Sequence, residues 1–114
     1  MPRFVEVVPK VWGREEWIVN CDEYCGKLIH LKAGASGSLH YHKEKKETFF
    51  LLSGMALIMI GGDDFALEDE TMAVTILPNV PHSMTGVSDA VLLEISTHHD
   101  DDDTYRLEES RDTN

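Results

Sequence analysis

The sequence predicts an all-β fold, a small barrel or sandwich built from short strands. Apolar runs of four to seven residues recur between clusters of glycine, proline and aspartate. No stretch keeps a helical periodicity for three turns, which argues against a helical core. Short strands that each end at a turn signal are typical of barrels and sandwiches.

Ten segments are expected to form strands, because each is apolar or alternating and ends near a turn signal. The pair Gly61-Gly62 separates the sixth segment from the seventh and can supply positive φ angles. The stretch Pro78-Asn79-Val80-Pro81 separates the eighth from the ninth and forces an extended connection. In chain order, the segments are residues 4–8, 17–20, 26–32, 38–42, 48–53, 55–60, 64–67, 73–77, 82–85 and 91–97.

Length and composition favour one globular domain over residues 1–114. The chain is 42% apolar and 27% charged, and its 114 residues fall within the range served by a single hydrophobic core. Residues 100–114 are expected to form an acidic segment that leaves the barrel along its surface, with a frayed end.

The charge balance excludes two classes of partner. With 21 acidic and 10 basic residues, the net charge is -11, so the chain repels nucleic-acid phosphates and anionic lipids. No apolar run approaches the ~18 residues of a membrane-spanning helix, and the first residues do not resemble a signal peptide. We therefore expect a cytoplasmic protein with neither a membrane nor a nucleic acid as partner.

Several side chains with metal-binding or redox potential are expected to be structural. Cys21 and Cys25 are spaced C-x3-C and have no second pair, so we expect two reduced thiols. His30 lies in an expected strand and is assigned a structural role. His98 and His99 precede the aspartate run, which predicts a solvated edge without a functional metal.

Three histidines and one glutamate form the most informative pattern in the chain. Three imidazoles and one carboxylate can make a metal site. The first part follows G-x5-H-x-H-x4-E-x6-G, and a later histidine follows a proline. The residues are Gly34, His40, His42, Glu47, Gly54, Pro81 and His82.

Strand alternation brings these residues toward one another. Residues two apart share a face, so His40 and His42 point the same way and Tyr41 is expected to pack outward. The charged turn at residues 43–46 lets the chain reverse, so that Glu47 opens the next strand close to the two imidazoles. A buried, unpaired Glu47 carboxylate would be strongly unfavourable, and a bound cation would remove that cost. His82 can complete the set from across the barrel.

This pattern resembles the first motif of the cupin superfamily, which it matches without an insertion. The second cupin motif is only partly kept: Pro81-His82 is present, Asn79 stands in the position of a glycine, Thr71 replaces the opening glycine and Gly86 the closing asparagine. The resemblance implies a small single-domain cupin, a double-stranded β-helix or jelly-roll barrel. It also implies one divalent metal ion held by His40, His42, Glu47 and His82.

A shorter similarity concerns the segment from Val11 to Trp17. Its Trp12-Gly13 looks like the Pro-Trp-Gly segment of the small cupins related to type II mannose-6-phosphate isomerase. Val11 stands where those relatives have proline, and Ser83 follows the ligand histidine where they often have arginine. Trp12 and Trp17 are expected to be core or dimer-interface aromatics.

The ligand set and the resemblance together favour a metal-dependent isomerase or epimerase acting on a sugar or sugar phosphate. Zinc, manganese, iron and nickel all suit the donors. A metal that polarises a carbonyl needs a base beside it, and Glu94, which shares a strand face with Leu92 and Ser96, is the candidate catalytic base. An iron-dependent dioxygenase and a noncatalytic binding or sensor cupin are the alternatives.

A homodimer is expected from the N-terminal strand. A barrel of 114 residues leaves edge strands, and the apolar run at residues 4–8 can pair with a partner's sheet.

Overall fold

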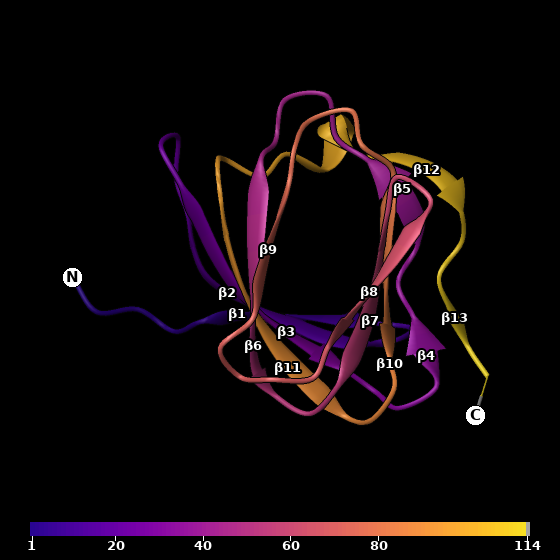
Figure 1. Cartoon of the computed structure of the whole chain (residues 1–114). Helices are drawn as coiled ribbons and strands as arrows, with labels where there is room; N and C mark the ends of the chain where they lie inside the picture. The colour runs from indigo at the N-terminus through magenta and orange to yellow at the C-terminus, as the bar shows by residue number, and fades with distance from the viewer. Residues whose placement is uncertain (114) are drawn as a thin grey trace.

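The fold is the expected all-β barrel, made of two antiparallel sheets that face each other (Figure 1). The structure is a computed structural model and describes residues 1–113. The first sheet has the order β1-β2-β3-β11-β6-β9. Its strands are β1 (Glu6–Lys10), β2 (Gly13–Asn20), β3 (Cys25–Leu31), β6 (Glu47–Ser53), β9 (Ala73–Ile76) and β11 (Ala90–Ser96).

The second sheet has the order β12-β5-β10-β4-β13, and β7 joins it by pairing with β10 and with β8. Its first four strands along the chain are β4 (Ala35–Ser36), β5 (Leu39–Tyr41), β7 (Ala56–Ile60) and β8 (Asp63–Leu67). The last three are β10 (His82–Gly86), β12 (Tyr105–Glu108) and β13 (Arg111–Asp112), and a 3-10 turn η1 (Asp101–Asp103) directly precedes β12.

Period-two alternation places the core between the sheets. Strand β3 alternates buried and half-buried residues along its whole length, and β6 does so over its first five. The inward side chains form one apolar cluster, whose burial drives folding. Its fully buried members include Ile29, Phe49, Leu51, Ile58 and Leu92.

The C-terminal segment corrects the expectation of a departing, frayed tail. After η1 the chain turns back, and β12 and β13 add to β5 and β4 at the edge of the second sheet, as the yellow strands in Figure 1 show. Tyr105 stacks on Tyr41 with ring centroids 5.2 Å apart. Backbone pairing depends little on side-chain polarity, so the acidic composition did not reveal these strands.

The N-terminal strand is displaced from its expected position. Strand β1 covers Glu6–Lys10, rather than residues 4–8, because it pairs in a hairpin with β2, with Lys10 opposite Gly13. Phe4 precedes the strand and its side chain is fully exposed.

Gly34 and Gly54, the two glycines of the motif, both have φ of +79°, a region that side chains with a Cβ rarely adopt. At Gly54 a Cβ would also lie 2.1 Å from the backbone oxygen of Asp89.

We expect Gly54→Ala to lower the free energy of unfolding by more than about 3 kcal/mol. Gly62→Ala is the control, because Gly62 has φ of +92° and open space around it; its cost should be about 1–2 kcal/mol. Urea unfolding of both variants gives the comparison, and equal losses would contradict the clash.

Candidate metal centre

The structure brings His40, His42, Glu47 and His82 together, and we call these four residues the ligand cluster. One donor atom from each lies within 4.8 Å of all the others. His40 in β5 and His82 in β10 are cross-strand partners, which places their imidazoles side by side. Glu47 opens β6 in the opposite sheet, so the cluster joins the two layers of the barrel.

Burial of the ligand cluster leaves polar atoms without partners. The exposed fractions of His42, Glu47 and His82 are 4%, 2% and 1%. Glu47 Oε2 lies 2.8 Å from His82 Nε2 and 3.4 Å from His42 Nε2. Nevertheless, within residues 1–113 neither Glu47 Oε2 nor His82 Nε2 has a hydrogen-bond partner of good geometry. Unsatisfied buried polar atoms are costly, and a cation between them would satisfy both.

Hydrogen bonds from the outer ring nitrogens orient the three imidazoles. The Nδ1 atoms of His40, His42 and His82 lie 3.0, 3.0 and 2.9 Å from the carbonyl oxygens of Ser38, Asp103 and Val80. Carbonyl oxygens only accept, so each Nδ1 carries the proton and each Nε2 keeps its lone pair. This is the tautomer that a metal-binding imidazole needs.

Electrostatics keep the cluster in its ligand-ready protonation state. Burial, together with the neighbouring His82 and His42, lowers the pKa of His40 to about 3. Burial disfavours the charged form of Glu47, whereas the Lys45 ammonium favours it, and the Glu47 pKa lies well below its usual range. Metal binding requires deprotonated donors, and His40 and Glu47 meet this requirement at neutral pH.

Lys45 is a buried cation that sequence reasoning missed. Its exposed fraction is 3%, and its Nζ lies 2.8 Å from Glu94 Oε2 and 3.2 Å from Glu47 Oε1. Burial alone would lower the Lys45 pKa, but the carboxylates of Glu94 and Glu47 raise it above its ordinary value. Lys45 was grouped with the charged turn at residues 43–46. Its spacing of two from Glu47 is the signal that would have placed it on the inner face.

Glu94 lies inside the cavity as the strand alternation suggested, with an exposed fraction of 3%. Besides its ion pair with Lys45, Glu94 Oε2 accepts a hydrogen bond of 3.0 Å from Ser96 Oγ. Its other carboxylate oxygen takes part in neither contact. The carboxylate is therefore fixed at one oxygen, and the second is available to a ligand.

His99 corrects the expectation of a solvated edge. Its side chain is only 9% exposed and lines the cavity, where Nδ1 accepts a hydrogen bond of 2.8 Å from Lys45 Nζ. Nε2 donates to Asp101 Oδ1 at 2.8 Å. The side-chain amide of Asn20 pairs with both backbone polar groups of His99 and folds this segment back over the barrel. His98 is exposed, as expected.

The remaining aromatic and sulfur side chains have structural positions. Trp12 is buried in the core and lines the cavity. Trp17 Nε1 donates to Glu15 Oε1 at 2.8 Å, and Lys27 Nζ lies 4.1 Å from the centroid of the Trp17 ring. His30 Nε2 lies 2.7 Å from Glu16 Oε1. Both cysteines are free thiols, as expected.

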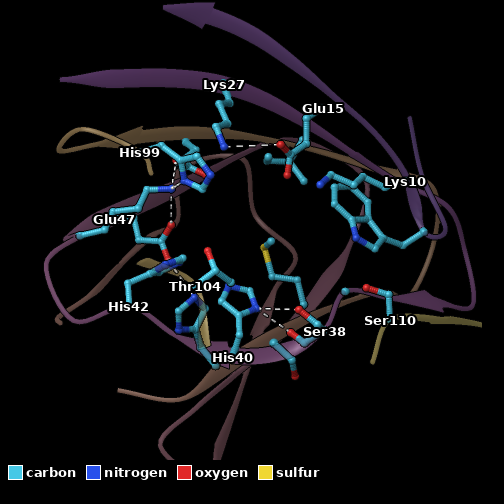
Figure 2. A pocket seen from close by; sticks show the side chains of 18 of the residues that line it. Lys10, Glu15, Lys27, Ser38, His40, His42, Glu47, His99, Thr104 and Ser110 are labelled. Atoms are coloured by element: carbon cyan, nitrogen blue, oxygen red, sulfur yellow. Dashed lines mark hydrogen bonds and ion pairs between the residues drawn. The ribbon is translucent and has the colours of Figure 1, made fainter. Parts of the chain in front are cut away.

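The ligand cluster opens on a cavity with a volume of about 110 Å³. Figure 2 shows His42 and Glu47 on one side of this space and Lys10 and Ser110 on the other. Ile29, Phe49 and Met84 contribute apolar surface to the lining. The wall of the cavity is rich in charged groups.

Asn79 explains how the chain tolerates a departure in its second motif. It stands in the position of a glycine and has φ of +68°, a conformation that asparagine adopts more readily than most residues. Its backbone N–H donates to the carbonyl oxygen of His42 at 2.6 Å. The loop before His82 therefore keeps the conformation that glycine would allow.

The Asp103 carboxylate holds the turn between His42 and Glu47. It accepts hydrogen bonds from the backbone N–H groups of Lys43, Glu44 and Lys45 at 2.9 to 3.2 Å. Burial would raise the pKa of Asp103, but these three donors lower it below its ordinary value of 3.8. The carboxylate therefore stabilises the fold above that value, and the stabilisation disappears as the pH falls through the lower folded-state pKa.

We expect Asp103→Ala to lower the free energy of unfolding at pH 7 by about 2 kcal/mol, since charge-assisted hydrogen bonds are lost. Asp102→Ala is the matched control, because the Asp102 side chain is exposed. Chemical denaturation measures both. A loss in Asp103→Ala that persisted unchanged below the folded-state pKa would contradict this role of the carboxylate.

The fold is a small jelly-roll barrel, and three histidines and a glutamate gather on its inner face. The chain is a member of the cupin family: the family model of the cupin domain matches residues 27–96. This range contains all four residues of the ligand cluster.

Solved structures share the fold at low sequence identity. KdgF from Halomonas sp. superposes with a TM-score of 0.77 at 13% identity, covering 90% of this chain and 98% of that one. The capsular polysaccharide assembling protein CapF from Staphylococcus aureus gives 0.77 at 20% identity, covering 91% of this chain and 34% of that one. Oxalate decarboxylase from Bacillus subtilis gives 0.76 at 21%, covering 90% and 30%. The chain thus spans about a third of CapF and of oxalate decarboxylase. No curated protein matches the chain.

Among residues 1–113 there is no helix with the length and apolar character needed to cross a membrane.

Proposed function

We propose that this cupin is a metal-dependent isomerase or epimerase acting on a small sugar or sugar derivative. The observation that carries the proposal is the position of Glu94, whose carboxylate faces the same cavity as the ligand cluster. Lys45 links the two, since its Nζ contacts both Glu94 Oε2 and Glu47 Oε1. Proton transfer beside a carbonyl needs a base within reach of the polarised group, and this cavity offers both parts.

The ligand cluster would hold one divalent ion, and zinc, manganese, iron and nickel all suit its imidazole and carboxylate donors. When bound, such an ion supplies Lewis-acid polarisation of a carbonyl oxygen. The fit is supported by the unpartnered Glu47 Oε2 and His82 Nε2 and by the orientation of the three imidazoles.

Glu94 would move the proton. Its free oxygen can accept the proton from the carbon next to the carbonyl, while Lys45 and Ser96 hold the other oxygen. Glu94 would then return the proton to the former carbonyl carbon, while the proton of the adjacent hydroxyl group passes to the former carbonyl oxygen. These two transfers complete an aldose–ketose interconversion. Returning the proton to its original carbon from the opposite face would need a second acid. Lys45 stays protonated at neutral pH because its pKa is raised, and it limits the cost of burying the Glu94 charge.

The wall of the cavity supports a hydrophilic substrate. Lys27, Glu15 and Ser38 line it together with Trp12, an arrangement that offers several donors and acceptors and one aromatic face. Hydroxyl groups of a substrate can form additional hydrogen bonds with such a wall. The fold it shares with a capsular polysaccharide assembling protein is compatible with a carbohydrate substrate.

Deuterium exchange tests the proposed reaction. Metal-loaded protein is incubated in D2O with a panel of aldoses and their phosphates, and NMR follows deuterium entering beside the carbonyl. We expect exchange with at least one sugar, and a fall of about 100-fold or more in Glu94→Gln, at unchanged metal content. Glu44→Gln, on the exposed turn, is the control.

Three outcomes would overturn the isomerase proposal. No exchange with any sugar would remove it directly. Oxygen uptake by the iron-loaded protein would favour a dioxygenase, which the same donors permit. Tight sugar binding without chemical change would favour a binding or sensor protein.

We also propose that the protein is a homodimer. Among residues 1–113, strand β1 pairs with one strand, β2. Val7 in β1 and Val5 just before it are 55% and 42% exposed. An unpaired apolar edge is suited to pairing with a second copy. Light scattering should give twice the monomer mass; a monomer mass across a concentration series would reject this. The cytoplasmic location stays a prediction.

A further inference from the structure

We infer that the ligand of this cavity carries an anionic group, and that Lys10 and Arg106 at the rim bind that group. The inference rests on the proposed function, since it names the substrate class of the same cavity. Its basis is the distribution of charge around the cavity and the position of these two cations on the two sheets that enclose it.

Basic residues are concentrated at the cavity. The whole chain has 21 acidic and 10 basic residues. Four of the basic residues line this one cavity, against four of the acidic ones, so the local balance differs sharply from that of the rest of the molecule. The basic residues are Lys10, Lys27, Lys45 and Arg106.

The two inner lysines, Lys27 and Lys45, already form ion pairs with carboxylates. Lys45 contacts both Glu47 and Glu94, and Lys27 Nζ lies 3.4 Å from Glu15 Oε1. These three carboxylates and two lysines leave one negative charge, which a divalent ion at the ligand cluster would convert to a positive one. The inner cavity then has no carboxylate left over for further cations. The remaining acidic group of the lining, Asp101, has an 84% exposed side chain and contacts His99.

Lys10 and Arg106 form no such close ion pair within residues 1–113. Within residues 1–113 neither side chain makes a hydrogen bond or a close ion pair, although Lys10 lies near enough to the exposed Asp101 carboxylate to attract it. Lys10 ends β1 in the first sheet, and Arg106 lies in β12 of the second sheet, opposite His40. Figure 2 shows Lys10 across the cavity from His42 and Glu47. A molecule that reaches the ligand cluster would therefore extend toward cations supplied by both sheets.

An anionic ligand would neutralise the positive charges of Lys10 and Arg106, whereas a neutral ligand would not. Arginine binds carboxylate and phosphate oxygens through paired N–H groups, and lysine adds a point charge. Lys10 is half-buried at the cavity, where attraction to an anion is stronger than in open solvent. The net charge of -11 would otherwise disfavour the approach of an anion, so local cations are needed to bind one.

Three sugars that differ only at carbon 6 test the inference: glucose, glucuronate and glucose 6-phosphate. Calorimetry measures their binding to the metal-loaded wild-type protein and to Lys10→Gln, Arg106→Gln and the double variant. We expect one or both anionic sugars to bind at least tenfold more tightly than glucose, and the double variant to lose at least tenfold of that affinity. Whichever of glucuronate and glucose 6-phosphate binds more tightly shows whether the cavity prefers a carboxylate or a phosphate ester.

Lys46→Gln is the matched control, because it removes one positive charge from an exposed side chain outside the cavity; its affinities should change less than twofold. Equal binding of all three sugars, unchanged affinity in the double variant, or no binding of either anion at millimolar concentration would overturn the inference. This experiment measures binding and not turnover. The inference of an anionic ligand can therefore be rejected even if deuterium exchange supports the proposed reaction. Conversely, anion binding that depends on Lys10 and Arg106 in a protein without exchange would reject only the proposed reaction.

Discussion

Changing His82 to alanine is expected to abolish stoichiometric metal binding and to weaken the affinity for a divalent ion by more than about 100-fold. Removing a hydrogen-bonded neighbour of a ligand typically costs 10- to 100-fold, so loss of a ligand itself should cost more. His82 is fully buried, and its Nε2 lies 2.8 Å from Glu47 Oε2, at the centre of the ligand cluster. No other imidazole of the cluster can move into its place, because His40 and His42 are each held at Nδ1 by a backbone carbonyl.

Competition against a chromophoric chelator gives the affinity, and elemental analysis of protein purified without oxygen gives the stoichiometry. His98→Ala is the matched control, since it removes an exposed imidazole outside the cluster. Far-UV circular dichroism of metal-free protein verifies that both variants keep the fold. Equal metal content in His82→Ala and His98→Ala would remove His82 from the site.

Replacing Lys45 with methionine is expected to lower the free energy of unfolding by about 3–5 kcal/mol. Methionine keeps the length of the side chain but leaves the carboxylates of Glu47 and Glu94 buried without their cation, and breaking a buried ion pair from one side has a cost of this size. Both carboxylates are at most 3% exposed, so solvent cannot replace the ammonium. Lys46→Met, on an exposed side chain, should be nearly neutral.

Two further measurements separate loss of charge from loss of packing in Lys45→Met. Adding Glu94→Gln should recover part of the lost stability, because it removes one of the two uncompensated charges. The Lys45 pKa is raised in the folded state above its ordinary value of 10.5, so its contribution is complete below that value and is lost as the pH rises through the folded-state pKa. In this alkaline range the free energy of unfolding of the wild type should therefore fall more steeply with pH than that of Lys45→Met. Identical alkaline profiles, without rescue by Glu94→Gln, would contradict the assignment.

The residues of the ligand cluster could be found from the sequence because strand alternation is a local rule. His40 and His42 are two apart, and the turn at residues 43–46 is short enough to return Glu47 to the same site. His82 could be placed near them only by assuming a closed barrel, which the resemblance to cupins supported, since nothing local to Pro81-His82 specifies that β10 pairs with β5. Long-range pairing of this kind is a property of the closed barrel.

Other features depended on contacts that composition conceals. Lys45 is one of three lysines in the charged turn at residues 43–46, and only the barrel shows that it points inward between two carboxylates. His99 follows the end of β11 and returns to the cavity because Asn20, 79 residues away, binds its backbone. The acidic C-terminal segment pairs through its backbone with the edges of β5 and β4, a contact for which side-chain hydrophobicity gives no signal.

The central claim is that His40, His42, Glu47 and His82 hold a metal ion, and anomalous diffraction tests it most directly. Crystals of protein loaded with zinc or manganese are measured on either side of the absorption edge of the metal. The predicted result is one anomalous peak at about 2.0–2.2 Å from the three Nε2 atoms and one oxygen of Glu47, distances usual for such ligands. A peak elsewhere, such as beside His98 or the aspartates of η1, with none inside the ligand cluster, would contradict the claim.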